Sequence, residues 1–344
     1  MKKSLIALAV AGAFAAPAFA ATSNVDVYGK LHMSVSKFDD QPDGINDVQI
    51  TSNPSRIGVK GAEDLGNGLS AIWQVESGVN LDEQSGTWAS RNSFVGLAGG
   101  FGTVLLGNHD TPLKLVGRSV DLFGDTLADS RNVMGVGSDI RAKNVITYMT
   151  PNLGGLGLAV AYSTDIGNSG NNGDANDMDV YNLNATYSNG PIYLGLGYGD
   201  GNGHEALGMG AHLRVAAGFT FGNAKLVAQY DKLDDDSDTV GTQPGDFDAW
   251  MVGGAYTIGN VVLKANYMEG EYDGDALLAG YDVEQWTVGA DYNLSKRTAL
   301  YALYTSGTNV CLGCGAGSSD RIAGGAVTGD ADISALSLGV VHSF

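Results

Sequence analysis

The chain has 344 residues, with 19 Lys and Arg against 38 Asp and Glu, so its formal net charge is −19. A chain this acidic is unsuited to bind nucleic acid or anionic lipid headgroups through its charge. Glycine supplies 51 residues and proline 7, without a Gly-X-Y period, which excludes a collagen-like sequence. After the first twenty residues no run of about 18 apolar residues remains, which excludes a helical membrane span.

The first twenty residues have the three parts of a secretory signal peptide. Two lysines follow the initial Met, residues 5–14 are apolar, and residues 18–20 form an A-x-A cleavage signal. We expect residues 1–20 to be removed, which takes away both lysines and makes the net charge −21. Residues 21–344 are then expected to form a single exported domain.

From residue 25 onward, apolar and polar side chains alternate with a period of two in many short segments. In the first segment, Leu31 and Val35 share one face, while Lys30 and His32 lie on the other. This alternation is typical of strands with one apolar and one polar face. It predicts about sixteen strands, at 25–37, 54–64, 69–79, 91–99, 101–109, 141–150, 156–164, 178–188, 191–199, 209–221, 224–233, 247–258, 261–272, 283–293, 298–306 and 331–344.

The connections between these strands alternate between tight turns and long loops. The tight turns contain the Asn and Gly that hairpins with positive φ require, as at 65–68 and 222–223. The long loops fall near 38–53, 80–90, 110–140, 165–177, 200–208, 234–246, 273–282 and 307–330. An even number of strands, with short turns at one end and long loops at the other, predicts an all-β fold, a transmembrane antiparallel β-barrel.

Aromatic residues occur at both ends of the apolar faces. Those before tight turns are Tyr187, Phe221, Tyr256 and Tyr292, and those towards the long loops are Tyr162, Tyr230 and Tyr267. Two such groups are typical of the aromatic girdles at the two surfaces of a membrane. The alternative is that these rings fill the core of a soluble β-sandwich, which fits the even spacing and the loop alternation less well.

Several segments, in their order along the chain, resemble the general porins of Gram-negative bacteria. They are VDVYGK at 25–30, SRIGVKGAED at 55–64, AIWQVE at 71–76, RNSFVGL at 91–97, FGDT at 123–126 and VHSF at 341–344. The resemblance spans nearly the whole exported chain. It implies a homotrimer of sixteen-stranded barrels in the outer membrane, without enzymatic activity, each barrel having its long third loop, about 110–140, folded into the lumen. The terminal Phe344 resembles the signal by which the barrel-assembly machinery recognises such proteins.

The period of two also predicts which charged side chains face the lumen. Lys30, Arg56 and Arg91 fall on the polar face of their strands, with Lys60 beside them. The resemblance implies a further basic residue early in the sixth strand, which either Arg141 or Lys143 supplies. It also implies that the third loop opposes this basic wall with the carboxylates of Asp121, Asp125 and Asp129. Gly117, followed by Arg118, stands where relatives often have an acidic residue.

Two charged walls of opposite sign create a transverse field that favours small hydrophilic solutes and ions over apolar ones. The alternative is that the basic residues pair with lumen carboxylates such as Glu76 only to neutralise the interior. We therefore expect passive diffusion through a water-filled channel. The acidic long loops, including 231–238, together with the net charge, predict a mild cation preference.

Two other kinds of protein fit the sequence less well. A channel specific for sugar or phosphate needs an aromatic row or an excess of basic residues, and neither is evident in the sequence. A surface enzyme needs clustered catalytic residues, and His109 beside Asp110 is the one candidate pair.

The remaining signals predict no cofactor. Cys311 and Cys314 indicate a small disulfide in the last loop, with a half zinc site or a redox pair as alternatives. The five histidines lack metal-ligand spacing, so no metal site is expected. Besides the other copies of the trimer, the expected partners are outer-membrane lipid and lipopolysaccharide.

Overall fold

The computed structural model describes residues 24–39, 48–83, 86–134, 139–164, 179–201, 210–234, 246–273, 281–314 and 332–344. The expected signal peptide, 1–20, lies outside the described residues, as do large parts of the predicted long loops. Neither of the two helices in the described part of the chain is long and apolar enough to cross a membrane.

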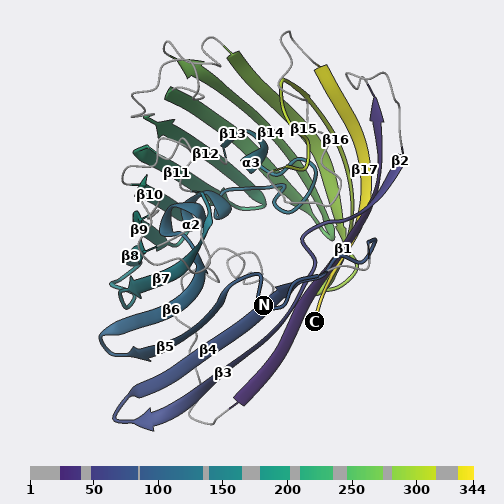
Figure 1. The fold of residues 1–344 in the computed structure, drawn as a ribbon. Helices are drawn as coiled ribbons and strands as arrows, with labels where there is room; N and C mark the ends of the chain where they lie inside the picture. Colours follow the sequence, from purple (N-terminus) through teal and green to yellow (C-terminus); the bar gives the residue numbers. More distant parts are fainter. Residues whose placement is uncertain are drawn as a thin grey trace.

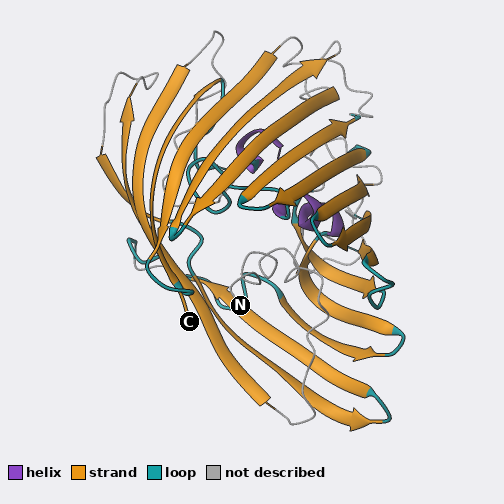
Figure 2. Cartoon of the chain, turned by 180° about the vertical axis from the view of Figure 1, so that it is seen from behind, coloured by secondary structure: helices purple, strands orange, loops and turns teal. Residues whose placement is uncertain are grey.

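One antiparallel sheet closes on itself to form a barrel, because β1 pairs with β17 on one side and with β3 on the other (Figures 1 and 2). Its strands are β1 (Asn24–Asp39), β2 (Val48–Ser52), β3 (Arg56–Gly66), β4 (Leu69–Gly78), β5 (Ser93–Gly99), β6 (Gly102–Asp110), β7 (Arg141–Met149), β8 (Leu156–Ser163), β9 (Val180–Asn189), β10 (Ile192–Gly201), β11 (His212–Phe221), β12 (Ala224–Leu233), β13 (Asp246–Ile258), β14 (Val261–Asp273), β15 (Tyr281–Asn293), β16 (Thr298–Thr308) and β17 (Asp332–Ser343).

The strands β2 and β3 together occupy one position in the barrel. β2 pairs with residues 33–37 of β1, and β3 pairs with residues 24–30 of the same strand. Pro54 lies between β2 and β3 and has no N–H to donate, which interrupts the ladder there. The predicted barrel of sixteen strands is therefore confirmed, although β2 falls within the segment that the sequence predicted as a long loop.

The outer surface of the barrel is apolar. Leu194, Leu226 and Val288 are exposed on it, while neighbouring positions point inward. Aromatic side chains pair across strands on this surface, with Tyr230 opposite Trp250 and the ring centroids of Trp250 and Tyr267 5.2 Å apart. An apolar exterior with aromatic residues at its edges is what a barrel in contact with lipid requires.

The described parts of the connection from β6 to β7, residues 111–134 and 139–140, turn into the barrel and are called the inner loop (Figure 1). It contains two short helices that the sequence did not predict, α2 (Pro112–Arg118) and α3 (Arg131–Met134). Thr111 caps α2 by accepting a hydrogen bond from the backbone N–H of Lys114. Pro112 stands in the first turn, where a missing N–H costs little.

The inner loop is held against one side of the barrel by an apolar core inside the lumen. Its residues in this core are Val116, Val120, Leu127, Val133 and Met134, and residues of the wall include Phe38, Phe247, Met251 and Met268. The inward faces of β13 and β14 are therefore partly apolar, and Phe38 adds an apolar residue at the far end of β1, whereas Lys30 and Arg56 make the inward faces of β1 and β3 basic nearer the cavity. Burial of these side chains fixes the loop on one side and leaves the lumen open on the other.

Candidate pore constriction

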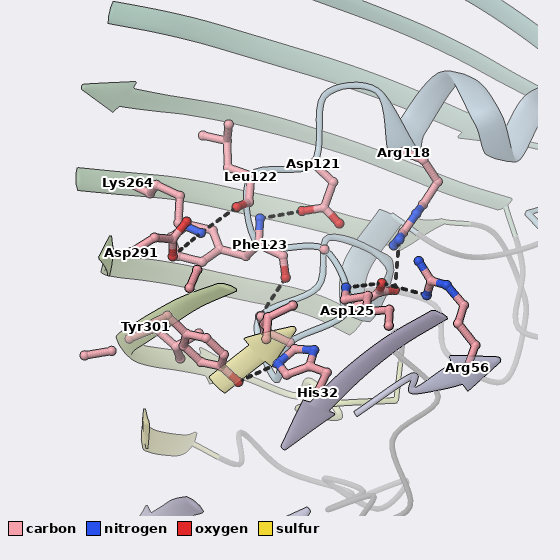
Figure 3. Close-up of a pocket in the computed structure, with 17 residues that line it drawn as sticks. His32, Arg56, Arg118, Asp121, Leu122, Phe123, Asp125, Lys264, Asp291 and Tyr301 are labelled. Carbon is pink, nitrogen blue, oxygen red and sulfur yellow. Dashed lines mark hydrogen bonds and ion pairs between the residues drawn. The ribbon is translucent and has the colours of Figure 1, made fainter. Parts of the chain in front are cut away.

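A cavity of about 450 Å³ lies between the inner loop and the barrel wall (Figure 3). The wall contributes residues from the continuous arc of strands β14 to β17, β1 and β3, and the inner loop contributes residues 118 and 121–126. The charged residues of the lining are Lys30, Arg56, Arg118, Asp121, Asp125, Lys264 and Asp291.

Asp125 is the point at which the inner loop meets the basic wall. Its carboxylate lies 2.8 Å from Nζ of Lys30 and 3.3 Å from Nη1 of Arg56. Arg118, from the loop itself, lies 2.8 Å from the other oxygen of the same carboxylate (Figure 3). Although burial alone would raise the pKa of Asp125, the cations of Arg118, Lys30 and Arg56 hold that pKa well below its usual range. The carboxylate therefore stays ionised.

A second loop carboxylate, Asp129, is fully buried behind Asp125. It accepts a hydrogen bond from Nε of Arg131 at 2.8 Å and one from Nη1 of Arg118 at 3.1 Å. Burial acts to raise the pKa of Asp129, but the two arginines outweigh burial and lower it. Lys30, Arg56, Arg118 and Arg131 thus place four cations around two carboxylates. The inner loop therefore presents arginines together with the carboxylates that the sequence predicted.

Asp121, the third predicted loop carboxylate, has no such partner at ion-pair distance among the described side chains. It accepts hydrogen bonds from the backbone N–H of Phe123 at 2.9 Å and of Ser130 at 3.3 Å. Burial, and next the negative charge of Asp129, raise the pKa of Asp121 to about 6. Its charge therefore changes within the range of ordinary environmental pH.

Lys264, on β14, holds the tip of the inner loop to the barrel wall, and it was not among the residues predicted from the sequence. Its Nζ donates to the carbonyl of Leu122 at 3.0 Å and lies 2.9 Å from Asp291 of β15. The same ammonium lies 4.7 Å from the ring centre of Phe123 (Figure 3). The period of two, applied to the strand at 261–272 as it was to 25–37, places Lys264 on the inward face and could have revealed it.

The other predicted basic residues lie in the lumen but outside the lining of this cavity. Nε of Arg91 lies 2.6 Å from Glu76, which also accepts a hydrogen bond from the hydroxyl of Tyr28 at 2.9 Å. Nζ of Lys60 lies 5.2 Å from the ring centre of Tyr28. The pairing of Arg91 with Glu76 has the geometry that the neutralising alternative requires.

Arg141 and Lys143, the two alternatives for a basic residue on the sixth predicted strand, differ in position. Arg141 lies 3.0 Å from Asp110 and donates to Asn92 at 2.7 Å. Lys143 is exposed on β7, beside the left-handed residue Asn144. The ionic groups of the lumen thus include Arg141.

The start of the last loop also folds inward. A disulfide joins Cys311 and Cys314, whose Cα atoms are 5.5 Å apart, and Val310 and Leu312 are buried in the core around the inner loop. The backbone N–H of Gly313 donates to the carbonyl of Leu127 at 3.0 Å. The disulfide-bonded turn is therefore a direct neighbour of the inner loop.

Phe344 lies at the point where the barrel closes. Its backbone N–H donates to the carbonyl of Gly29, and its carbonyl accepts from the N–H of Gly29, each at 3.1 Å. In the described part of the chain, no three His, Cys, Asp or Glu side chains gather as a metal site would.

Comparison with known proteins agrees with this geometry. A family model described as Gram-negative porin matches residues 7–310. The chain is 31% identical over 340 residues to the major outer membrane protein P.IB of Neisseria gonorrhoeae, covering 89% of this chain and 93% of that protein. It is 34% identical over 323 residues to outer membrane porin protein 32 of Delftia acidovorans, covering 88% of each.

Solved structures have the same fold. A structure titled anion-selective porin from Comamonas acidovorans matches with a TM-score of 0.77 and 28% identity, covering 94% of this chain and 100% of that one. OmpT of Vibrio cholerae, in a trimer form, matches with a TM-score of 0.70 at 19% identity, covering 94% of this chain and 100% of that one.

Proposed function

The chain belongs to the Gram-negative porin family, and from this premise we propose that small hydrophilic solutes and ions diffuse passively past its inner loop, anions more readily than cations. Its relatives are outer-membrane proteins, and the family and fold are those of channels without enzymatic activity. The chain is accordingly an outer-membrane channel.

The proposed anion preference rests on the excess of cations around Asp125 and Asp129. Lys30, Arg56 and Arg118 contact the first carboxylate, and Arg131 contacts the second. Even when Asp121 is counted as ionised, the cations remain in excess. An ion that passes this cavity meets a positive field, which attracts anions and repels cations.

The mild cation preference expected from the net charge is not supported. The similar porin from Comamonas acidovorans is titled anion-selective. The charge of the whole chain is a weak guide because salt screens exposed charges beyond about 8–10 Å, whereas a partly buried constriction is screened much less. The local charges of the constriction therefore weigh more than the acidic outer loops.

We further propose that three copies assemble in the membrane, where they contact lipid and lipopolysaccharide after insertion by the barrel-assembly machinery. Val25 and Val27 of β1 are each more than half exposed, and Gly29 beside them lets an aromatic ring of the C-terminal residue approach closely. This apolar strip offers a surface for a neighbouring copy. The Vibrio cholerae relative is described in a trimer form.

Recording in planar bilayers tests these proposals. The purified protein is added to a membrane with a KCl gradient, and single-channel steps and the reversal potential are measured. A reversal potential on the anion side, with steps that close in threes, supports the proposal. A cation-side value contradicts the proposed selectivity, block by a single solute class indicates a substrate-specific channel, and absence of conductance contradicts the channel itself.

A further inference from the structure

Arg214 is the largest completely buried side chain of the described residues, and it is not part of the constriction. It lies on β11 directly across from Asp231 of β12, and its Nε donates to that carboxylate at 2.9 Å. Asp231 also accepts from Nε2 of Gln229's side-chain amide at 3.0 Å and lies 3.3 Å from Nε2 of His212. The barrel wall therefore fixes the guanidinium firmly in place. From the sequence, Asp231 was counted with the acidic loop residues 231–238, although it is also the third residue from the end of the predicted strand 224–233.

The other side of the same guanidinium binds the inner loop at both of its ends. Nη1 donates to the carbonyl of Leu113, in α2, at 3.4 Å and to the carboxylate of Asp139. Nη2 donates to the carbonyl of Met134, the last residue of α3. One side chain of the wall thus connects the beginning and the end of a loop that otherwise crosses the lumen.

We propose that Arg214 is the positioning residue that fixes how far the inner loop projects into the lumen and thereby keeps the constriction open and constant in size. The inference rests on the proposed channel function, because a fixed constriction matters for conduction. Arg214 does not touch the permeating solute, since the inner loop lies between it and the cavity lined by Asp125.

Arginine suits this role because its planar group offers five N–H donors in a fixed arrangement, whereas lysine offers a single charged centre. Asp231, Asp139 and two backbone carbonyls lie around the group in different directions. A lysine at this position keeps the positive charge but cannot reach all four acceptors. The loop would lose contacts at one or both ends.

Gly117 provides independent evidence that the loop is shaped around this guanidinium. A Cβ atom at Gly117 would lie 2.6 Å from Nη1 of Arg214, which is closer than side chains approach. A Gly117→Ala variant keeps every charged group and displaces the guanidinium.

The test compares single-channel records of Arg214→Lys and Gly117→Ala with those of the natural protein, each as the full-length assembly purified from the outer membrane. Both variants should show increased current fluctuation and closure at lower voltage. Arg297→Lys is the matched control, because Arg297 is exposed at a short turn, and it should behave as the natural protein.

A covalent tether separates positioning of the loop from loss of a buried contact. A Cβ atom at Gly197 would lie 3.4 Å from Cβ of Leu113, close to the separation of about 3.8 Å in disulfides. In the Arg214→Lys background, Leu113→Cys with Gly197→Cys should restore the quiet record. The matched pair Leu113→Ser with Gly197→Ser should not.

Quiet records from Arg214→Lys, or noise that the tether does not reduce, overturn the proposal. If Arg214→Lys fails to assemble, a quiet Gly117→Ala channel overturns it and a noisy one supports it. Because the natural protein is recorded in the same experiment, failure of the channel function appears as absent conductance, whereas failure of this inference leaves normal conductance.

Discussion

The carboxylate of Asp125, at the tip of the inner loop, lies 2.8 Å from the ammonium of Lys30 on β1. Its second oxygen lies 2.8 Å from Arg118 of the same loop, so a single carboxylate separates the cations of the wall from those of the loop. Asp125 has a left-handed backbone, with φ 64°, which the short side chain of an aspartate tolerates better than most.

Asp125→Asn removes the negative charge from this cluster and leaves the cations in place. The anion preference should increase, and the reversal potential in a KCl gradient should move further to the anion side. Removal of one partner from a buried ion pair costs about 3–5 kcal/mol, so the loop should also become less firmly held. Asp332→Asn, at the exposed start of β17, changes the net charge equally and is the control. Equal shifts in both variants would mean that the total charge sets the selectivity.

Arg56→Gln should have the opposite effect on selectivity. Arg56 lies 3.3 Å from Asp125 and lines the cavity, so its loss reduces the local positive excess. The reversal potential should move towards zero. Lys232→Gln removes a cation whose side chain is 45% exposed at the end of β12 and should leave the reversal potential unchanged. An unchanged value for Arg56→Gln would remove this arginine from the proposed selectivity site.

The charge of Asp121 should make the selectivity depend on pH. With its pKa raised to about 6, Asp121 is ionised above that pH and neutral below it. When the pH falls from about 7 to about 5, one negative charge is lost beside the cavity, and the anion preference should increase in a step centred near the raised value. An ordinary aspartate would titrate about two pH units lower. Asp121→Asn should show the high anion preference throughout and no step, whereas a step that persists in this variant must arise from another group.

The strands and the basic wall were predictable because the period of two records which side chains face lipid and which face water. The same rule places Lys30, on β1, and Arg56, on β3, on the inward face of the barrel. The ladder between these two strands contains no bulge that would change their direction. The rule does not distinguish Arg141 from Lys143, because residues two apart share a face in a regular strand; their positions differ because the ladder shifts register between Gly107 and His109 opposite them. Irregular structure of this kind leaves no periodic signal.

The inner loop was much less predictable than the wall. Its extent followed from the spacing of the strands, but its two short helices depend on burial inside the lumen. The pairing of Arg118 and Arg131 with Asp125 and Asp129 depends on a folded loop, so a count of charges in the sequence does not reveal it. The buried pair of Arg214 and Asp231 was hidden for a different reason: both residues lie inside predicted strands, but Asp231 was counted with the acidic residues of the loop that follows.

The disulfide between Cys311 and Cys314 should protect the contact between the last loop and the inner loop. Without the cross-link, the turn should open more readily, by about 2 kcal/mol according to the entropy of closing so short a loop. Cys311→Ser with Cys314→Ser should therefore speed hydrogen exchange at the backbone N–H of Gly313, which donates to Leu127. Amide hydrogens of the β12–β13 pair provide the internal reference. Unchanged exchange at Gly313 would show that the apolar contacts of Val310 and Leu312 hold the turn on their own.

Phe123→Ala should widen the constriction at the tip of the inner loop. Phe123 is 1% exposed and packs against Tyr301 and Leu303 of β16. Its removal enlarges the adjoining cavity and takes away the ring beneath Lys264, and truncation of a buried Phe costs about 3–5 kcal/mol. Single-channel conductance should rise, and the exclusion limit in a liposome swelling assay should move to larger solutes. Phe101→Ala, at an exposed turn, is the control. Because Asp125 and its cations remain in place, the reversal potential should change little. A large change would mean that the position of the loop tip, and not the charges alone, determines the ion preference.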